Sequence, residues 1–148
     1  MAIVWRDALS VGNGPIDDDH RHLILLINTL ELILTTDRSV ADLRAALDEL
    51  GVYTQAHFAK EERIMIALRY AKYDRHKLAH GELIDQLKLA DRLLQEFGAA
   101  IPTTTAHLPQ EVRDSLGGLM RHWLLEHIVK EDLQLKPLLV DRPKDFAP

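Results

Sequence analysis

Histidine and carboxylate side chains occur where a helix would otherwise carry leucine or isoleucine. The chain has eight histidines among 148 residues and no cysteine. Imidazole nitrogens and carboxylate oxygens without sulfur are ligands that suit Fe, Mn, Zn or Co. Residues spaced by four project from one helical face about one turn apart, so they can share a metal site. His57-x3-Glu61 and His76-x3-His80 have this spacing.

The apolar repeat around these residues indicates that they lie on helix faces that pack into a core. His20 lies in phase with Leu23 and Ile27, at the spacings of three and four that are typical of a packed helix. A buried carboxylate without a partner is costly, and a buried imidazole needs hydrogen bonds. One such histidine is more often a satisfied core residue than a ligand. Several buried polar residues on three helices together predict a metal site. These residues are His20, His57, Glu61, His76 and His80.

The other histidines divide by the same geometry. His22 points roughly 200° away from His20 around the helix, so we expect it at the surface. His107 is expected in a loop, and His122 is expected to be exposed or to contact a ligand rather than to be one. His127 is the best candidate on the fourth helix. Both Glu131 and Asp132 follow it, and the spacing of four gives Glu131 a slight preference.

Four stretches with a helical apolar repeat must position these groups. Ser39 and Asp42 resemble a capping box, Pro109 fits a first helical turn, and Pro137 should end the fourth helix. The short connections predict an all-α, antiparallel, up-down-up-down four-helix bundle in a single domain. The predicted parts are an irregular arm 1–15, helices 16–36, 40–69, 73–97 and 109–136, and a tail 137–148.

Composition excludes several classes of protein. Net charge is −5 with acids and bases interspersed, whereas a nucleic-acid-binding domain would show a basic stripe. The lack of cysteine excludes disulfides and thiolate sites and suits a reducing compartment. The start of the chain lacks the pattern of a signal peptide, and the apolar run around Leu23 to Ile27 is too short to cross a membrane. We therefore expect a cytoplasmic protein without membrane association.

Taken together, these motifs resemble the hemerythrins, and in particular the bacterial single-domain members. The resemblance covers nearly the whole chain and implies two iron ions joined by a bridging oxo or hydroxo group. It favours Asp132 over Glu131 as a ligand. Asp19 departs from the family pattern, since bacterial members often have Gln there, as does His22, where Lys is common. The matching residues are Trp5-Arg6-Asp7, Asp17-x-x-His20, His57-Phe58-x-x-Glu61-Glu62, His76-x3-His80 and Trp123-x3-His127-Ile128-x3-Asp132.

The resemblance also implies which iron each ligand holds. One iron would be held by His76, His80 and His127, the other by His20 and His57. Glu61 and Asp132 would bridge them. The second iron is then one ligand short of six and could bind dioxygen. Residues that match the oxygen-pocket lining of the family are Phe58, Trp123, Leu124 and Ile128, although plain core packing explains Phe58 and Trp123 equally well.

The implied function is reversible dioxygen binding by a monomer that is not an enzyme, for transport, storage or delivery, with a redox or delivery partner protein. One alternative is a module that senses oxygen or nitric oxide. Another is a di-iron enzyme of the oxidase or peroxidase type. Ferritin-like di-iron enzymes use four carboxylates and Glu-x-x-His pairs. No Glu-x-x-His occurs in this sequence, which favours oxygen binding over oxidation.

Overall fold

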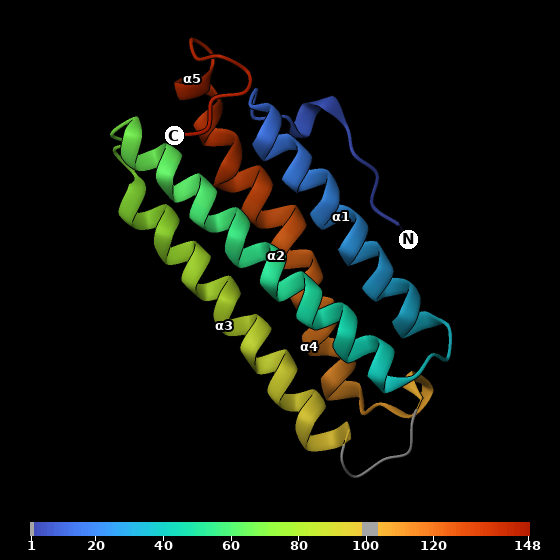
Figure 1. The fold of residues 1–148 in the computed structure, drawn as a ribbon. Coiled ribbons are helices and arrows are strands. Elements are labelled where there is room, and N and C mark those ends of the chain that lie inside the picture. Colours follow the sequence, from blue (N-terminus) through green and yellow to red (C-terminus); the bar gives the residue numbers. More distant parts are fainter. Residues whose placement is uncertain (1, 99–103) are drawn as a thin grey trace.

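The computed structural model describes residues 2–98 and 104–148, except for the side chains of Phe97, Leu124 and Leu125. Within these residues the chain is helical, with one isolated bridge between Ser39 and Thr104. Four long helical segments pack side by side (Figure 1). In chain order the elements are η1 (Asp7–Leu9), α1 (Gly14–Thr35), α2 (Val40–Ala67), α3 (Tyr73–Gly98), η2 (Thr105–His107), α4 (Gln110–Arg121), η3 (His122–Ile128), η4 (Asp132–Leu135) and α5 (Lys136–Leu139).

The long helices form a closed ring of neighbours. α1 packs against α2, α2 against α3, α3 against α4, and α4 again contacts α1. Figure 1 shows consecutive helices running in opposite directions. The all-α four-helix bundle predicted from the sequence is therefore confirmed.

Local side chains explain where α1 and α2 begin. The Asn13 side chain accepts a hydrogen bond from the Ile16 backbone N–H at 3.1 Å, and Pro15 occupies the first turn. Both features stabilise a helix start, so α1 begins two residues earlier than the predicted position 16. Ser39 accepts from the Asp42 backbone N–H at 3.0 Å and caps α2.

The fourth helical segment differs from the prediction of one helix over 109–136. After α4, the residues of η3 adopt π-helical geometry, in which hydrogen bonds span five residues. A turn at Glu131 follows, and η4 begins at Asp132. Pro137 does not end this segment: it lies in the first turn of α5, where its missing N–H costs nothing.

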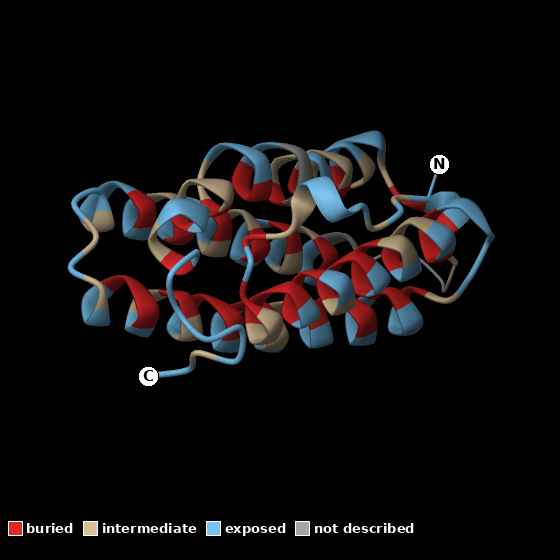
Figure 2. Ribbon diagram, turned by 90° about the horizontal axis from the view of Figure 1, so that it is seen from above, coloured by how far each residue is buried: buried red, intermediate tan, exposed pale blue. Residues whose placement is uncertain are grey.

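Two apolar clusters fill the interior, and buried residues line the inward faces of the helices (Figure 2). The larger cluster contains Leu23, Phe58, Leu83 and Ile128. The smaller one contains Ile16, Ile64, Leu135 and Leu139, with Tyr73 packed against it. Every helical segment passes from one cluster to the other, and the order reverses from each helix to the next. Between the clusters each segment carries one or two of the predicted polar residues, which therefore form a layer across the core.

Among the described residues, no helix combines the length and the apolar character that crossing a membrane requires.

Candidate metal centre

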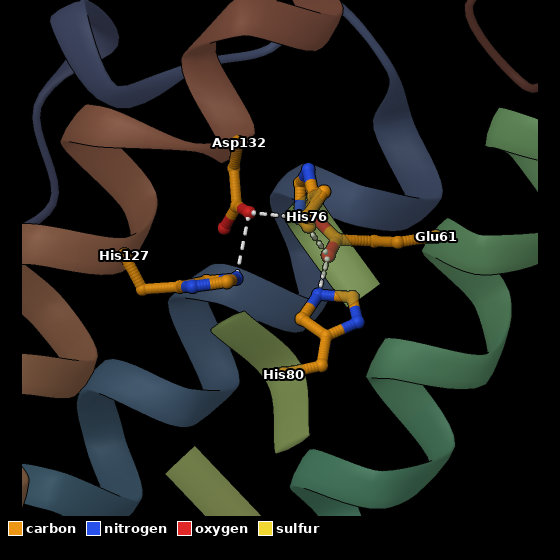
Figure 3. A group of neighbouring side chains, drawn as sticks. All are labelled: Glu61, His76, His80, His127 and Asp132. Carbon is orange, nitrogen blue, oxygen red and sulfur yellow. Dashed lines mark hydrogen bonds and ion pairs between the residues drawn. The ribbon is translucent and has the colours of Figure 1, made fainter. Parts of the chain in front are cut away.

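Seven polar side chains from all four helical segments meet in the layer between the apolar clusters. Each is at most 3% exposed. Figure 3 shows five of them, with Glu61 of α2, His76 and His80 of α3, and His127 and Asp132 of the fourth segment pointing toward one another. His20 of α1 and His57 of α2 complete the cluster. These are the seven residues that the family resemblance names.

The seven form two overlapping groups whose ligand atoms lie within 4.8 Å of one another. One group is Glu61, His76, His80, His127 and Asp132; the other is His20, His57, Glu61 and Asp132. The two carboxylates belong to both groups, whereas each histidine belongs to one.

In the first group, one oxygen of each carboxylate faces the histidines. Asp132 Oδ1 lies 3.0 Å from His127 Nε2 and 3.1 Å from His76 Nε2. Glu61 Oε2 lies 3.0 Å from His80 Nε2 and 3.5 Å from His76 Nε2.

The second group uses the other oxygen of each carboxylate. Asp132 Oδ2 lies 3.1 Å from His20 Nε2. Glu61 Oε1 lies 3.4 Å from His57 Nε2 and 3.7 Å from His20 Nε2. Each carboxylate thus presents one oxygen to each group, as a ligand that bridges two cations would.

Most of these close contacts lack hydrogen-bond geometry. The Nε2 atoms of His20, His57, His76 and His127, Glu61 Oε1 and both Asp132 oxygens are buried without a hydrogen-bond partner among the described residues. Leaving a buried polar atom unsatisfied costs about 1–3 kcal/mol. Atoms that lie close together but do not hydrogen-bond to one another are suited to surround a common cation. The residues therefore fit a metal, and the nitrogen and oxygen donor set fits iron.

The electrostatics of the cluster demand positive charge. Burial disfavours charge on His20, but the negative charges of the nearby Asp132 and Glu61 carboxylates raise its pKa to about 9. The same two carboxylates overcome burial at His76 and raise its pKa to about 10. Burial would raise the pKa of Glu61, but the surrounding histidines hold it well below its usual value. A proton on imidazole or a metal cation can supply the charge that the carboxylates require.

Two further carboxylates contact the outer ring nitrogens of the histidines, and the sequence analysis assigned neither of them a role. Asp19 Oδ2 lies 3.1 Å from His57 Nδ1, and Glu62 Oε1 lies 3.1 Å from His80 Nδ1. Burial would raise the pKa of Asp19, but hydrogen bonds with His57 and Lys60 lower it to about 2. Their positions beside His20 and Glu61 in the sequence are the signal that could have indicated them.

The remaining polar candidates lie outside the cluster. Glu131 pairs with Arg75 at 3.0 Å, so the preference that spacing gave it over Asp132 does not match its location. His22 is half-buried, with its ring 4.2 Å from that of Tyr53, rather than fully solvated. His107 is exposed, and His122 is half-buried with Nε2 3.8 Å from Glu126.

Two of the four apolar residues predicted to line a pocket, Phe58 and Trp123, lie beside the histidines. Phe58 stacks on His80 with ring centroids 3.8 Å apart and an interplanar angle of 7°. Trp123 is fully buried, with its ring centroid 6.0 Å from that of His57 and 6.4 Å from that of His20. Ile128 is also fully buried. The side chain of Leu124 lies outside the described part of the chain.

Comparison with known proteins points to one family. The family model of the hemerythrin HHE cation binding domain matches residues 12–139. The chain is 31% identical over 130 residues to the bacteriohemerythrin of Stenotrophomonas maltophilia, covering 88% of this chain and 76% of that protein. It is 28% identical over 141 residues to the bacteriohemerythrin of Clostridium acetobutylicum, covering 87% and 95%, respectively. A hemerythrin-like protein of Naegleria gruberi is 27% identical over 136 residues, covering 91% and 92%. The chain belongs to the hemerythrin family.

Proposed function

We propose that this protein binds two iron ions in the buried cluster and takes up dioxygen there reversibly. The observation that carries the proposal is that Glu61 and Asp132 belong to both groups of candidate ligands. One iron would be held by His76, His80 and His127, and the other by His20 and His57, with the two carboxylates bridging them. Because the second group contains four residues where the first contains five, it leaves room for a small ligand.

Two ferrous ions would supply an open coordination position and the two electrons that dioxygen uptake requires. The side chains around the centre control what else reaches it. Trp123 and Ile128 are fully buried, and the Trp123 ring lies near both His20 and His57. Apolar walls keep water and protons away from the site, which favours the release of dioxygen unchanged. The arrangement therefore supports a carrier or store of oxygen rather than an enzyme.

Gas exchange tests this function directly. The reduced, iron-loaded protein is oxygenated, and the oxygen is then removed with inert gas while the absorption spectrum is followed. We expect the colourless di-ferrous form to return over repeated cycles. An oxidase would instead reduce one equivalent of oxygen to hydrogen peroxide in the first cycle and remain as di-ferric protein. Metal analysis of the same sample should give two irons per chain, and one metal per chain would contradict the proposal.

A further inference from the structure

Asp19 lies one residue before His20 in α1 and receives three hydrogen-bond donors from α2. The Tyr53 hydroxyl donates to Oδ1 at 3.0 Å. Lys60 Nζ lies 2.7 Å from Oδ2, and His57 Nδ1 lies 3.1 Å from the same oxygen. The three donors are spaced by four and three residues, so they form one stripe on α2. The carboxylate of one buried residue thus joins α1 to α2 beside the group formed by His20 and His57.

We propose that Asp19 is the positioning residue for the metal held by His20 and His57, because it fixes the proton of His57 on Nδ1. This inference rests on the proposed di-iron site. An ionised carboxylate can only accept hydrogen bonds, so the contact requires a proton on Nδ1. A neutral imidazole protonated there leaves Nε2 free to bind a metal. His57 Nε2 faces Glu61 Oε1 at 3.4 Å, inside the cluster.

A similar but more exposed contact between a carboxylate and a histidine occurs in the group that contains His76, His80 and His127. Glu62 contacts His80 Nδ1, and Lys77 Nζ lies 3.5 Å from its other oxygen. The Glu62 side chain is 23% exposed, whereas that of Asp19 is 9% exposed. Water therefore screens Glu62 more than Asp19. Asp19, the less screened of the two carboxylates, lies beside the group that contains His20 and His57. This group has fewer candidate ligands, and the proposed function places dioxygen there.

In the group that contains His20 and His57, Asp19 is the carboxylate that contacts the outer ring nitrogen of a histidine. His20 Nδ1 is buried and has no hydrogen-bond partner among the described residues. His57 is thus the histidine of the pair that a carboxylate orients. Loss of Asp19 should consequently affect one metal of the two, and a general loss of folding would affect both.

The experiment compares Asp19→Asn with Asp18→Asn. Asp18 is the exposed neighbour, whose carboxylate pairs with Arg21 at 2.7 Å, so the control removes the same charge one residue away. Metal-free protein is titrated with ferrous iron under anaerobic conditions. We expect Asp19→Asn to bind one of its two irons about 10- to 100-fold more weakly. Mössbauer spectra of the di-ferric protein should show one altered iron site and one unchanged site, and Asp18→Asn should match the wild type.

A second measurement is independent of any variant. In zinc-loaded wild-type protein, nitrogen-15 NMR of the histidine rings should show a proton on Nδ1 of His57. A proton absent from that atom would overturn the inference, even if Asp19→Asn failed to fold. The inference is equally wrong if Asp19→Asn only lowers the melting temperature and leaves both iron sites unaltered. In either case a wild-type protein with two irons leaves the proposed function standing, whereas a wild-type protein without them removes both.

Discussion

Asp132 Oδ1 lies 3.0 Å from His127 Nε2, although the two residues are five positions apart in the sequence. In an α-helix that separation would turn their side chains about 140° away from each other. The chain brings them together by leaving the α-helical path. The π-helical segment η3 ends at Ile128, the backbone turns at Glu131, and η4 begins at Asp132. Such π-helical segments often occur at functional sites.

The position of Asp132 predicts opposite results for two charge-removing substitutions. Asp132→Asn should abolish the two-iron spectrum, because Asp132 belongs to both ligand groups. Glu131→Gln should retain two irons per chain, because Glu131 lies outside the cluster and pairs with Arg75. Iron analysis and the absorption spectrum of the two purified variants measure the difference. An intact spectrum in Asp132→Asn beside a lost one in Glu131→Gln would reverse the assignment.

The same segment shows where inference from the sequence reached its limit. The i, i+4 pairs His57–Glu61 and His76–His80 could be predicted because α2 and α3 are regular there. Ideal α-helical spacing favoured Glu131, which lies outside the cluster. The family resemblance favoured Asp132, which the backbone turns into the cluster. Periodicity describes the residues of one helix, so it could not reveal that Asp19 reaches His57 on another. That contact depends on how α1 and α2 pack.

Removal of the metal should lower the stability of the fold. A metal present at 100 times its dissociation constant stabilises the folded state by about 2.7 kcal/mol. In a domain of this size that corresponds to a shift of roughly 5–10 °C in melting temperature. Without a metal the fold should be less stable, because several buried nitrogens and oxygens of the cluster lack hydrogen-bond partners among the described residues. Thermal unfolding before and after chelation measures the shift.

Two histidine variants control that experiment. His76→Ala removes a buried member of the cluster, so it should lose iron and show no further change on chelation. His22→Ala removes a half-buried ring outside the cluster, so it should respond to chelation as the wild type does. Loss of the iron spectrum in His22→Ala would show that the cluster does not account for metal binding.

The buried apolar side chain of Ile128 is expected to prolong the lifetime of the proposed oxygenated form. Ile128 is fully buried next to His127, whereas the following residue, Val129, is 47% exposed. Ile128→Val removes one methylene group from the wall and should cost about 0.5–1.5 kcal/mol of stability. We expect the smaller side chain to let water reach the proposed centre more easily, and the oxygenated form therefore to convert faster to di-ferric protein with unchanged iron content. Val129→Ala removes surface carbons without opening the core, and its oxygenated form should decay at the wild-type rate. The decay is followed by absorption at a temperature where both variants are folded. Equal rates in the wild type and Ile128→Val would mean that this side chain only fills the core, and that other residues protect the site from water.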